Sequence, residues 1–189
     1  QLQKAMKITS PYLLNILSVW QSSVPSRFYV ITESTHGISL YEYIQSIESP
    51  LIRTLIKWFR LLSLGVQALH TKGITHGTII YIKTSTGSLK LRFPLTHLSC
   101  RGISSASLNI NQYTSPERLD GCFDSCVDIW SLGICFLEIL TQQPAYKECK
   151  TPQELISAIR SFTLPQSLSL VQNKPAEDLI RWCLSPVNS

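Results

Sequence analysis

The middle of this chain lacks acidic residues, although acids are scattered through the rest of it. No Asp or Glu lies between Ser49 and Pro116. This stretch therefore cannot supply the carboxylates that general bases and Mg²⁺ sites need. It does carry cations, at Arg53, Lys57, Arg60, Lys72, Lys83, Lys90, Arg92 and Arg101. The pattern predicts either a solvated basic face or a groove for phosphate or an acidic partner.

Long apolar runs are lacking too. No run approaches the roughly 20 residues that span a bilayer, and the N-terminal residues have no apolar core of a signal peptide. The sequence thus predicts no membrane association. The chain begins with Gln1 rather than Met, which predicts a piece of a longer chain that carries other domains.

Composition and charge indicate one globular domain. The chain has 189 residues, of which 44% are hydrophobic and 15% charged, enough for a sizeable core. Its net charge of +5 is basic, but below the level of a dedicated nucleic-acid binder. Because aromatic residues do not interleave with the cations, stacking on bases is not favoured. We expect protein partners, among them acidic ones, rather than nucleic acid.

Zinc-type spacing is absent as well. The cysteines stand at positions 100, 122, 126, 135, 149 and 183, and none has ligand spacing with another cysteine or with a histidine. Cys135 and Cys183 fall in apolar helical runs. We interpret the cysteines as small core hydrophobes of a reducing compartment, which predicts a cytoplasmic protein; a metal or disulfide role is the alternative.

The hydrophobic pattern predicts a mixed α+β fold that is mostly helical. Strands are expected at residues 13–19, 28–32, 78–82 and 89–93, with a loop at 21–26. Helices are expected at residues 1–8, 50–72, 126–140, 151–162 and 174–184. The helix at 126–140 is apolar on every face, which is typical of a helix buried on all sides.

Five segments together resemble the protein kinase family. Residues 10–17 are similar to the His-Pro-Asn-Ile region, residues 28–33 to the strand before the hinge, and residues 68–76 to the approach to His-Arg-Asp. Ser115-Pro116-Glu117 resembles Ala-Pro-Glu, and the run from Asp128 to Gly133 resembles the helix F signature. The last two, in this order and about a dozen residues apart, are the most specific.

The resemblance implies a protein kinase-like fold, mainly its helical C-lobe. Residues 1–34 correspond to a remnant of the N-lobe, namely the end of helix C and strands four and five. Residues 35–189 correspond to the C-lobe and end before its last helix. The hinge and gatekeeper positions fall at Thr32, Glu33, Ser34 and Thr35, where a nucleotide would be held. Both ends of the chain are expected to lie inside the domain.

The family's catalytic positions are degenerate in this sequence. Phosphoryl transfer uses a Gly-rich loop, a Lys, and carboxylate and amide groups that orient the hydroxyl and hold Mg²⁺. The Gly-rich loop and Lys would precede Gln1. The catalytic loop reads His76, Gly77 and Thr78 without an acid, and Phe93-Pro94-Leu95 replaces Asp-Phe-Gly. We therefore predict a pseudokinase without enzyme activity, with no Mg²⁺ site and no required cofactor, although ATP binding stays open.

Four residues are expected to be structural: Glu117, Asp128, Trp130 and Gly133. Asp128 should accept hydrogen bonds from backbone N–H groups near His76, unless it is a solvated residue at a helix start. Glu117 should lack the Arg that follows helix H in the family. His76 either completes a stacked hydrophobic column or is a satisfied core histidine.

Three function classes remain open. The first is a pseudokinase that acts as a protein-interaction or regulatory scaffold. The second is an atypical or truncated serine/threonine protein kinase that binds ATP and transfers phosphate, for which an acid must come from outside the acid-free stretch. The third is a basic binding module, whose affinity for acidic peptides would weaken steeply with salt.

Overall fold

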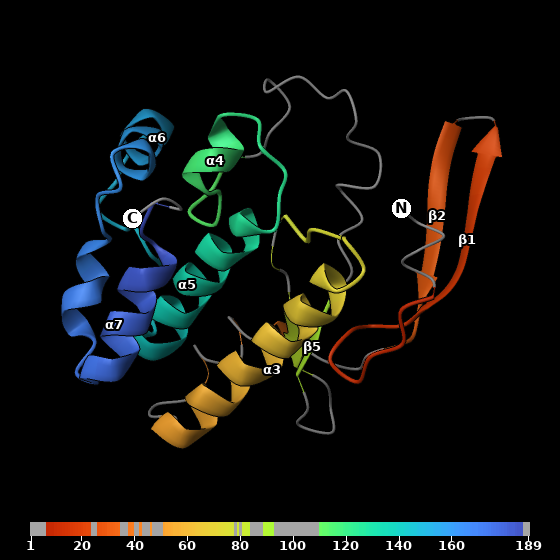
Figure 1. Cartoon of the computed structure of the whole chain (residues 1–189), viewed down its shortest axis with the longest axis horizontal. Coiled ribbons are helices and arrows are strands. Elements are labelled where there is room, and N and C mark those ends of the chain that lie inside the picture. Colours follow the sequence, from red (N-terminus) through yellow and green to blue (C-terminus); the bar gives the residue numbers. More distant parts are fainter. Residues whose placement is uncertain are drawn as a thin grey trace.

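The computed structural model describes residues 7–23, 26–34, 38–39, 42, 46, 51–77, 79, 81–83, 89–92 and 110–186. Short antiparallel strands come before and after the long helix α3 (Ile52–His70), and helices make up the rest of the described chain, so the fold is α+β, as predicted (Figure 1). The N-terminal hairpin stands to one side of the helices, which form the larger part of the molecule. None of the described helices is long and apolar enough to cross a membrane.

The hairpin consists of β1 (Ile16–Ser23) and β2 (Ser26–Thr32). Their antiparallel register runs from Ile16 opposite Thr32 to Ser23 opposite Ser26. The predicted loop at 21–26 is therefore wrong at residues 21–23 and 26, because these residues continue the ladder, while residues 24 and 25 lie outside the described residues. Polarity misled the prediction because residues on an exposed hairpin need not be apolar to pair through the backbone.

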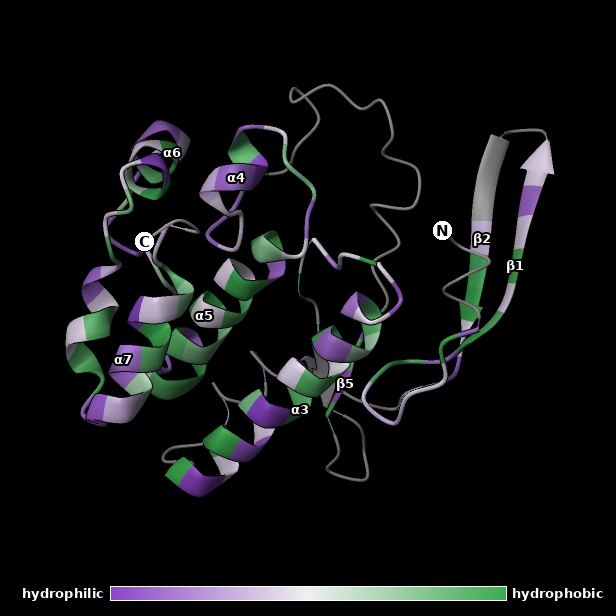
Figure 2. Ribbon diagram, in the orientation of Figure 1, coloured by the Kyte–Doolittle hydropathy of each residue, from purple (hydrophilic) through white to green (hydrophobic). Residues whose placement is uncertain are grey.

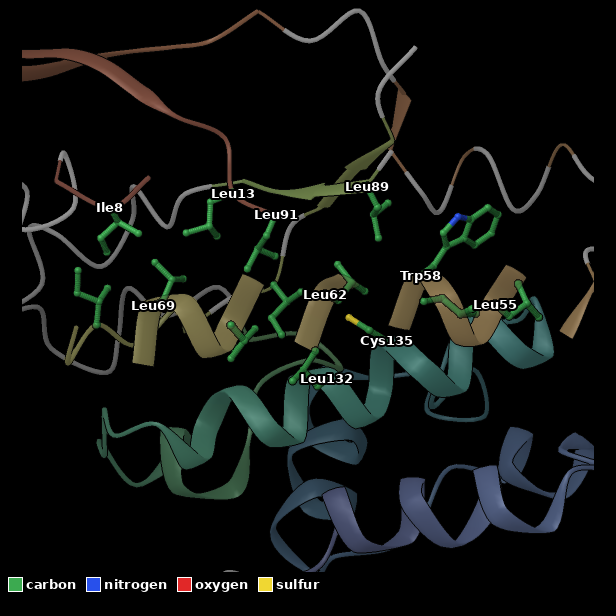
Figure 3. Close-up of a cluster of buried hydrophobic side chains, with 14 residues drawn as sticks. Ile8, Leu13, Leu55, Trp58, Leu62, Leu69, Leu89, Leu91, Leu132 and Cys135 are labelled. Atoms are coloured by element: carbon green, nitrogen blue, oxygen red, sulfur yellow. The ribbon is translucent and has the colours of Figure 1, made fainter. Parts of the chain in front are cut away.

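A long helix, α3 (Ile52–His70), packs against a small sheet made of β3 (Ile38–Ser39), β4 (Tyr81–Lys83) and β5 (Leu89–Leu91). The predicted β4–β5 hairpin is confirmed, with Tyr81 opposite Leu91. Leu13 bridges to Leu91 beside this sheet. Figure 3 shows the side chains of α3, β5 and α5 meeting in one buried cluster.

The buried helix α5 (Cys126–Thr141) joins two hydrophobic clusters. Twelve of its residues are buried, as the uniformly apolar pattern predicts. On one side it contacts α3; on the other it contacts α7 (Lys174–Cys183) and the 3₁₀ segment η2 (Gln166–Leu170). The helix ends with Gln142 in the left-handed conformation at φ 54°. Because neighbouring elements cover α5 on all sides, the helix holds the residues that contact its first turn in a fixed position.

Two shorter helices complete the fold. The helix α4 (Pro116–Leu119) follows Ser115, and α6 (Pro152–Arg160) follows Thr151. A capping box begins α6: the Thr151 hydroxyl accepts from the backbone N–H of Glu154, whose carboxylate accepts from the backbone of Thr151. Such caps stabilise a helix by about 1 kcal/mol. The predicted starts at Thr151 and Lys174 are therefore confirmed.

Candidate functional site

A buried carboxylate at the start of α5 organises the loop that follows α3. Asp128 is fully buried. Its Oδ1 accepts from the backbone N–H of Gly77 at 2.6 Å, and its Oδ2 accepts from the backbone N–H of His76 at 2.8 Å. The His70 Nε2 lies 2.7 Å from the same Oδ2. The contact expected between Asp128 and this loop is present, and three donors surround a charge that would otherwise be costly to bury.

The loop residues between α3 and β4 are held from a second side. His76 is buried, and its Nε2 lies 2.6 Å from the carbonyl oxygen of Arg92, just after β5. Gly77 has φ 76°, a left-handed conformation that suits glycine. The backbone of the loop is thus tied to α5 and to the end of β5. Thr78 and Phe93-Pro94-Leu95, singled out from the sequence, lie outside the described residues.

The segment after β2 carries a paired carboxylate. The Glu33 Oε1 lies 2.5 Å from the Lys90 Nζ and accepts from the backbone N–H of Asn15 at 3.1 Å. Burial alone would raise the pKa of Glu33, but the Lys90 ammonium and the Asn15 donors outweigh it and hold that pKa below its ordinary value. Thr32 ends β2 and Ser34 is exposed, while Thr35 lies outside the described residues. At physiological pH the Glu33 carboxylate is thus negatively charged and forms an ion pair with Lys90.

The segment from Tyr113 to Glu117 is anchored on α5. Ser131 donates through its Oγ to the carbonyl oxygen of Tyr113 at 2.7 Å, and the Tyr113 hydroxyl donates to the Glu138 carboxylate. The same carboxylate accepts from the backbone N–H of Ala145 at 2.8 Å. Burial raises the pKa of Tyr113 and of Glu138. The α5 helix therefore positions this segment as well as the loop at His76.

Glu117 stands in the first turn of α4 and lines a cavity of about 170 Å³ with Cys126, Trp130 and Trp182. Within the described part of the chain no ion pair involves Glu117. The Arg181 guanidinium instead pairs with Glu177, 2.7 Å from Nη2 to Oε1. Glu117 and Arg181 are thus not paired with each other.

Trp130 and Gly133 connect α5 to the C-terminal helices. Trp130 is buried and meets Phe162 edge to face, with ring centroids 6.1 Å apart. Gly133 faces α7 so closely that a β-carbon placed on it would lie 2.6 Å from the Cys183 Cβ. A glycine is required here for close approach of two helices, rather than for an unusual backbone conformation.

The described cysteines fit the prediction of core hydrophobes only in part: Cys135 and Cys183 are buried, Cys126 and Cys149 are half-buried, and Cys122 is exposed. Cys122, Cys126, Cys135, Cys149 and Cys183 are free thiols. Burial raises the pKa of Cys183 to about 11, so the thiol stays protonated at neutral pH. Among residues whose placement is described, no group of three His, Cys, Asp or Glu side chains could hold a metal ion.

Two side chains of this arrangement escaped the sequence analysis. His70 is the last residue of α3 and faces Asp128, and Glu138 receives the Tyr113 hydroxyl. His70 ends an amphipathic helix six residues before His76. This position indicates that its side chain lies near the loop that carries His76. Glu138 is an acid within an otherwise apolar run, and a buried carboxylate of this kind must find donors.

Comparisons with known proteins agree with this architecture. The family model for the protein kinase domain matches residues 1–189. The serine/threonine-protein kinase Wnk of Drosophila melanogaster is 25% identical over 187 residues, which cover 94% of this chain and 8% of that protein. The probable serine/threonine-protein kinase WNK8 of Oryza sativa subsp. japonica is 29% identical over 168 residues, covering 85% of this chain and 27% of that protein. The chain therefore spans well under two thirds of these curated relatives.

These relatives correct one prediction. The degenerate catalytic positions predict a chain that is not an enzyme, whereas the relatives are named as serine/threonine-protein kinases, which are enzymes. The prediction rested on the carboxylates missing from residues 49–116 and on the Gly-rich loop and Lys that would precede Gln1, and groups outside these residues can fill both roles. The chain holds 12 Asp and Glu residues, all outside that stretch, and its relatives extend well beyond the matched region.

Proposed function

Because the chain belongs to the protein kinase family, we propose that it forms the C-lobe of a serine/threonine protein kinase that binds ATP. In the proposed reaction a Ser or Thr hydroxyl oxygen of a protein substrate attacks the γ-phosphorus of ATP. The bond from that phosphorus to the ADP oxygen breaks, and the hydroxyl proton passes to a carboxylate. The names of the relatives support this reaction class.

The observation that carries the proposal is the triple anchorage of the Asp128 carboxylate. It holds the backbone of His76 and Gly77 and contacts His70, while the same helix holds Tyr113 through Ser131. Phosphoryl transfer depends on positioning more than on covalent chemistry by the protein. A helix that fixes two separate backbone segments is suited to that task, because each segment can then present groups to the substrate at a constant distance.

The proposed reaction requires carboxylates from other parts of the protein. Residues 49–116 contain no carboxylate, so the acids that orient the hydroxyl and hold Mg²⁺ must come from outside that stretch. Mg²⁺ requires hard oxygen ligands in near-octahedral geometry. Within this chain Asp128 is not available for that role, since both of its oxygens accept hydrogen bonds.

The test is phosphate transfer from radiolabelled ATP to Ser- and Thr-containing peptides by the full-length protein. We expect turnover with Mg²⁺, and a loss of about 100-fold in the Asp128→Asn variant, the order of effect that misplaced reacting groups produce. Asp178→Asn is the matched control, because Asp178 is exposed on α7 and pairs only at the surface with Lys174. Absence of turnover in the unaltered protein would contradict the proposed function, and full activity of Asp128→Asn would contradict the role of the anchorage.

A further inference from the structure

The exposed face of the N-terminal half of α3 combines cations with large aliphatic side chains. Arg53, Lys57 and Arg60 are exposed at helical spacings of four and three residues, so they form one row. Leu51, Ile52 and Ile56 lie beside them and are 75%, 43% and 47% exposed. Figure 2 shows hydrophilic and hydrophobic residues alternating along this end of α3. We call these six residues the α3 basic face.

The cations of this face have no paired carboxylate among the residues that the structure describes. The first turn of α3 contains no acid, and none occurs anywhere from Ser49 to Pro116. Arg53 and Lys57 are like charges at a spacing of four residues, which destabilises a helix by a few tenths of a kcal/mol. An acidic partner would remove that repulsion.

We propose that the α3 basic face docks an acidic segment of a partner protein in which carboxylates accompany aliphatic side chains. The row of cations extends about 10 Å along the helix axis, from the rise of 1.5 Å per residue. Carboxylates would meet this row, while aliphatic side chains would cover Ile52, Ile56 and Leu51, whose exposure leaves apolar area for burial. Nothing in the proposed phosphate transfer uses these residues, so the surface is separate from that reaction.

A partner peptide fits this face better than a lipid surface does. A helix that lies in a membrane interface inserts its main apolar face among the acyl chains. The main apolar face of α3 is already committed to the protein core through Leu55, Leu62 and Leu69. The aliphatic side chains that remain exposed form only a narrow row beside the cations, which matches one peptide rather than a flat bilayer.

The test measures binding of a fluorescein-labelled peptide of alternating Glu and Leu by fluorescence anisotropy. We expect binding that weakens as ionic strength rises, because salt screens exposed charges. The same peptide with Gln in place of Glu should not bind. The triple variant Arg53→Gln/Lys57→Gln/Arg60→Gln should weaken binding roughly tenfold or more, the combined effect of three exposed ion pairs. The variant Ile52→Ser/Ile56→Ser should also weaken it.

A matched control separates this face from the net charge of the protein. Lys72→Gln/Lys147→Gln/Lys150→Gln removes the same charge from exposed positions elsewhere and should bind as the unaltered chain does. Equal losses in both triple variants, or no binding of the acidic peptide, would overturn the proposal. Binding to vesicles of phosphatidylserine and phosphatidylcholine in preference to the peptide would overturn it in favour of a lipid surface. Thermal unfolding should show that the triple variant Arg53→Gln/Lys57→Gln/Arg60→Gln is at least as stable as the unaltered chain.

Discussion

Replacing Asp128 by Ala is expected to lower the free energy of unfolding by about 3 to 5 kcal/mol, as when one partner of a buried charged contact is removed. The substitution leaves the backbone N–H groups of His76 and Gly77 without the acceptor that they have at 2.8 and 2.6 Å. Each buried donor that loses its acceptor is destabilising by about 1 to 3 kcal/mol. Urea denaturation followed by circular dichroism measures the change.

Two further variants test this explanation. Asp128→Asn keeps one oxygen acceptor and should lose less stability than Asp128→Ala. Asp178→Ala is the control for an acid on a helix surface, since Asp178 pairs with Lys174 at 3.0 Å in an exposed position, and it should change stability by less than about 1 kcal/mol. If Asp128→Ala lost no more than Asp178→Ala, the carboxylate would not anchor the loop.

The second large effect is expected at Gly133, where α5 packs closely against α7. A β-carbon at this position would lie 2.6 Å from the Cys183 Cβ and 3.2 Å from the Leu184 Cδ2. In an exposed helix the change from Gly to Ala raises the free energy of unfolding by about 1 kcal/mol. Here the helices must move apart, and overpacking of this kind destabilises by about 1 to 3 kcal/mol. Gly133→Ala should therefore lower the midpoint of urea denaturation.

A swap of small residues provides the control for Gly133. Cys183→Gly removes the opposing β-carbon and is itself expected to destabilise α7. In the double variant Gly133→Ala/Cys183→Gly the two changes should compensate, so the combined loss is smaller than the sum of the single losses. Strict additivity, or a Gly133→Ala protein as stable as the unaltered chain, would contradict the close contact between α5 and α7.

The C-terminal helices could be predicted from the sequence because local and global signals agree there. Thr151-Pro152 and Lys174-Pro175 mark helix starts, and the structure begins α6 at Pro152 and α7 at Lys174. Near the N-terminus the polarity of residues 21–23 predicts a loop, although these residues continue β1. Hydrophobic alternation does not report a hairpin whose strands are held by backbone pairing alone.

The site was only partly predictable. The contact of Asp128 with the backbone near His76 followed from the family resemblance, whereas the participation of His70 depends on how α3 and α5 cross. The pairing of Glu33 with Lys90 joins residues far apart in the sequence, which no local pattern shows. The lack of acids in residues 49–116 shows that this stretch supplies no carboxylate. It does not determine whether the protein is an enzyme.

The most direct test of the kinase account is a calorimetric titration of the full-length protein with ATP, in the presence and absence of Mg²⁺. The account predicts binding that is stronger with Mg²⁺, because carboxylates outside residues 49–116 hold the metal against the phosphates. Binding of ATP to the same extent without Mg²⁺, or no binding under either condition, would contradict it.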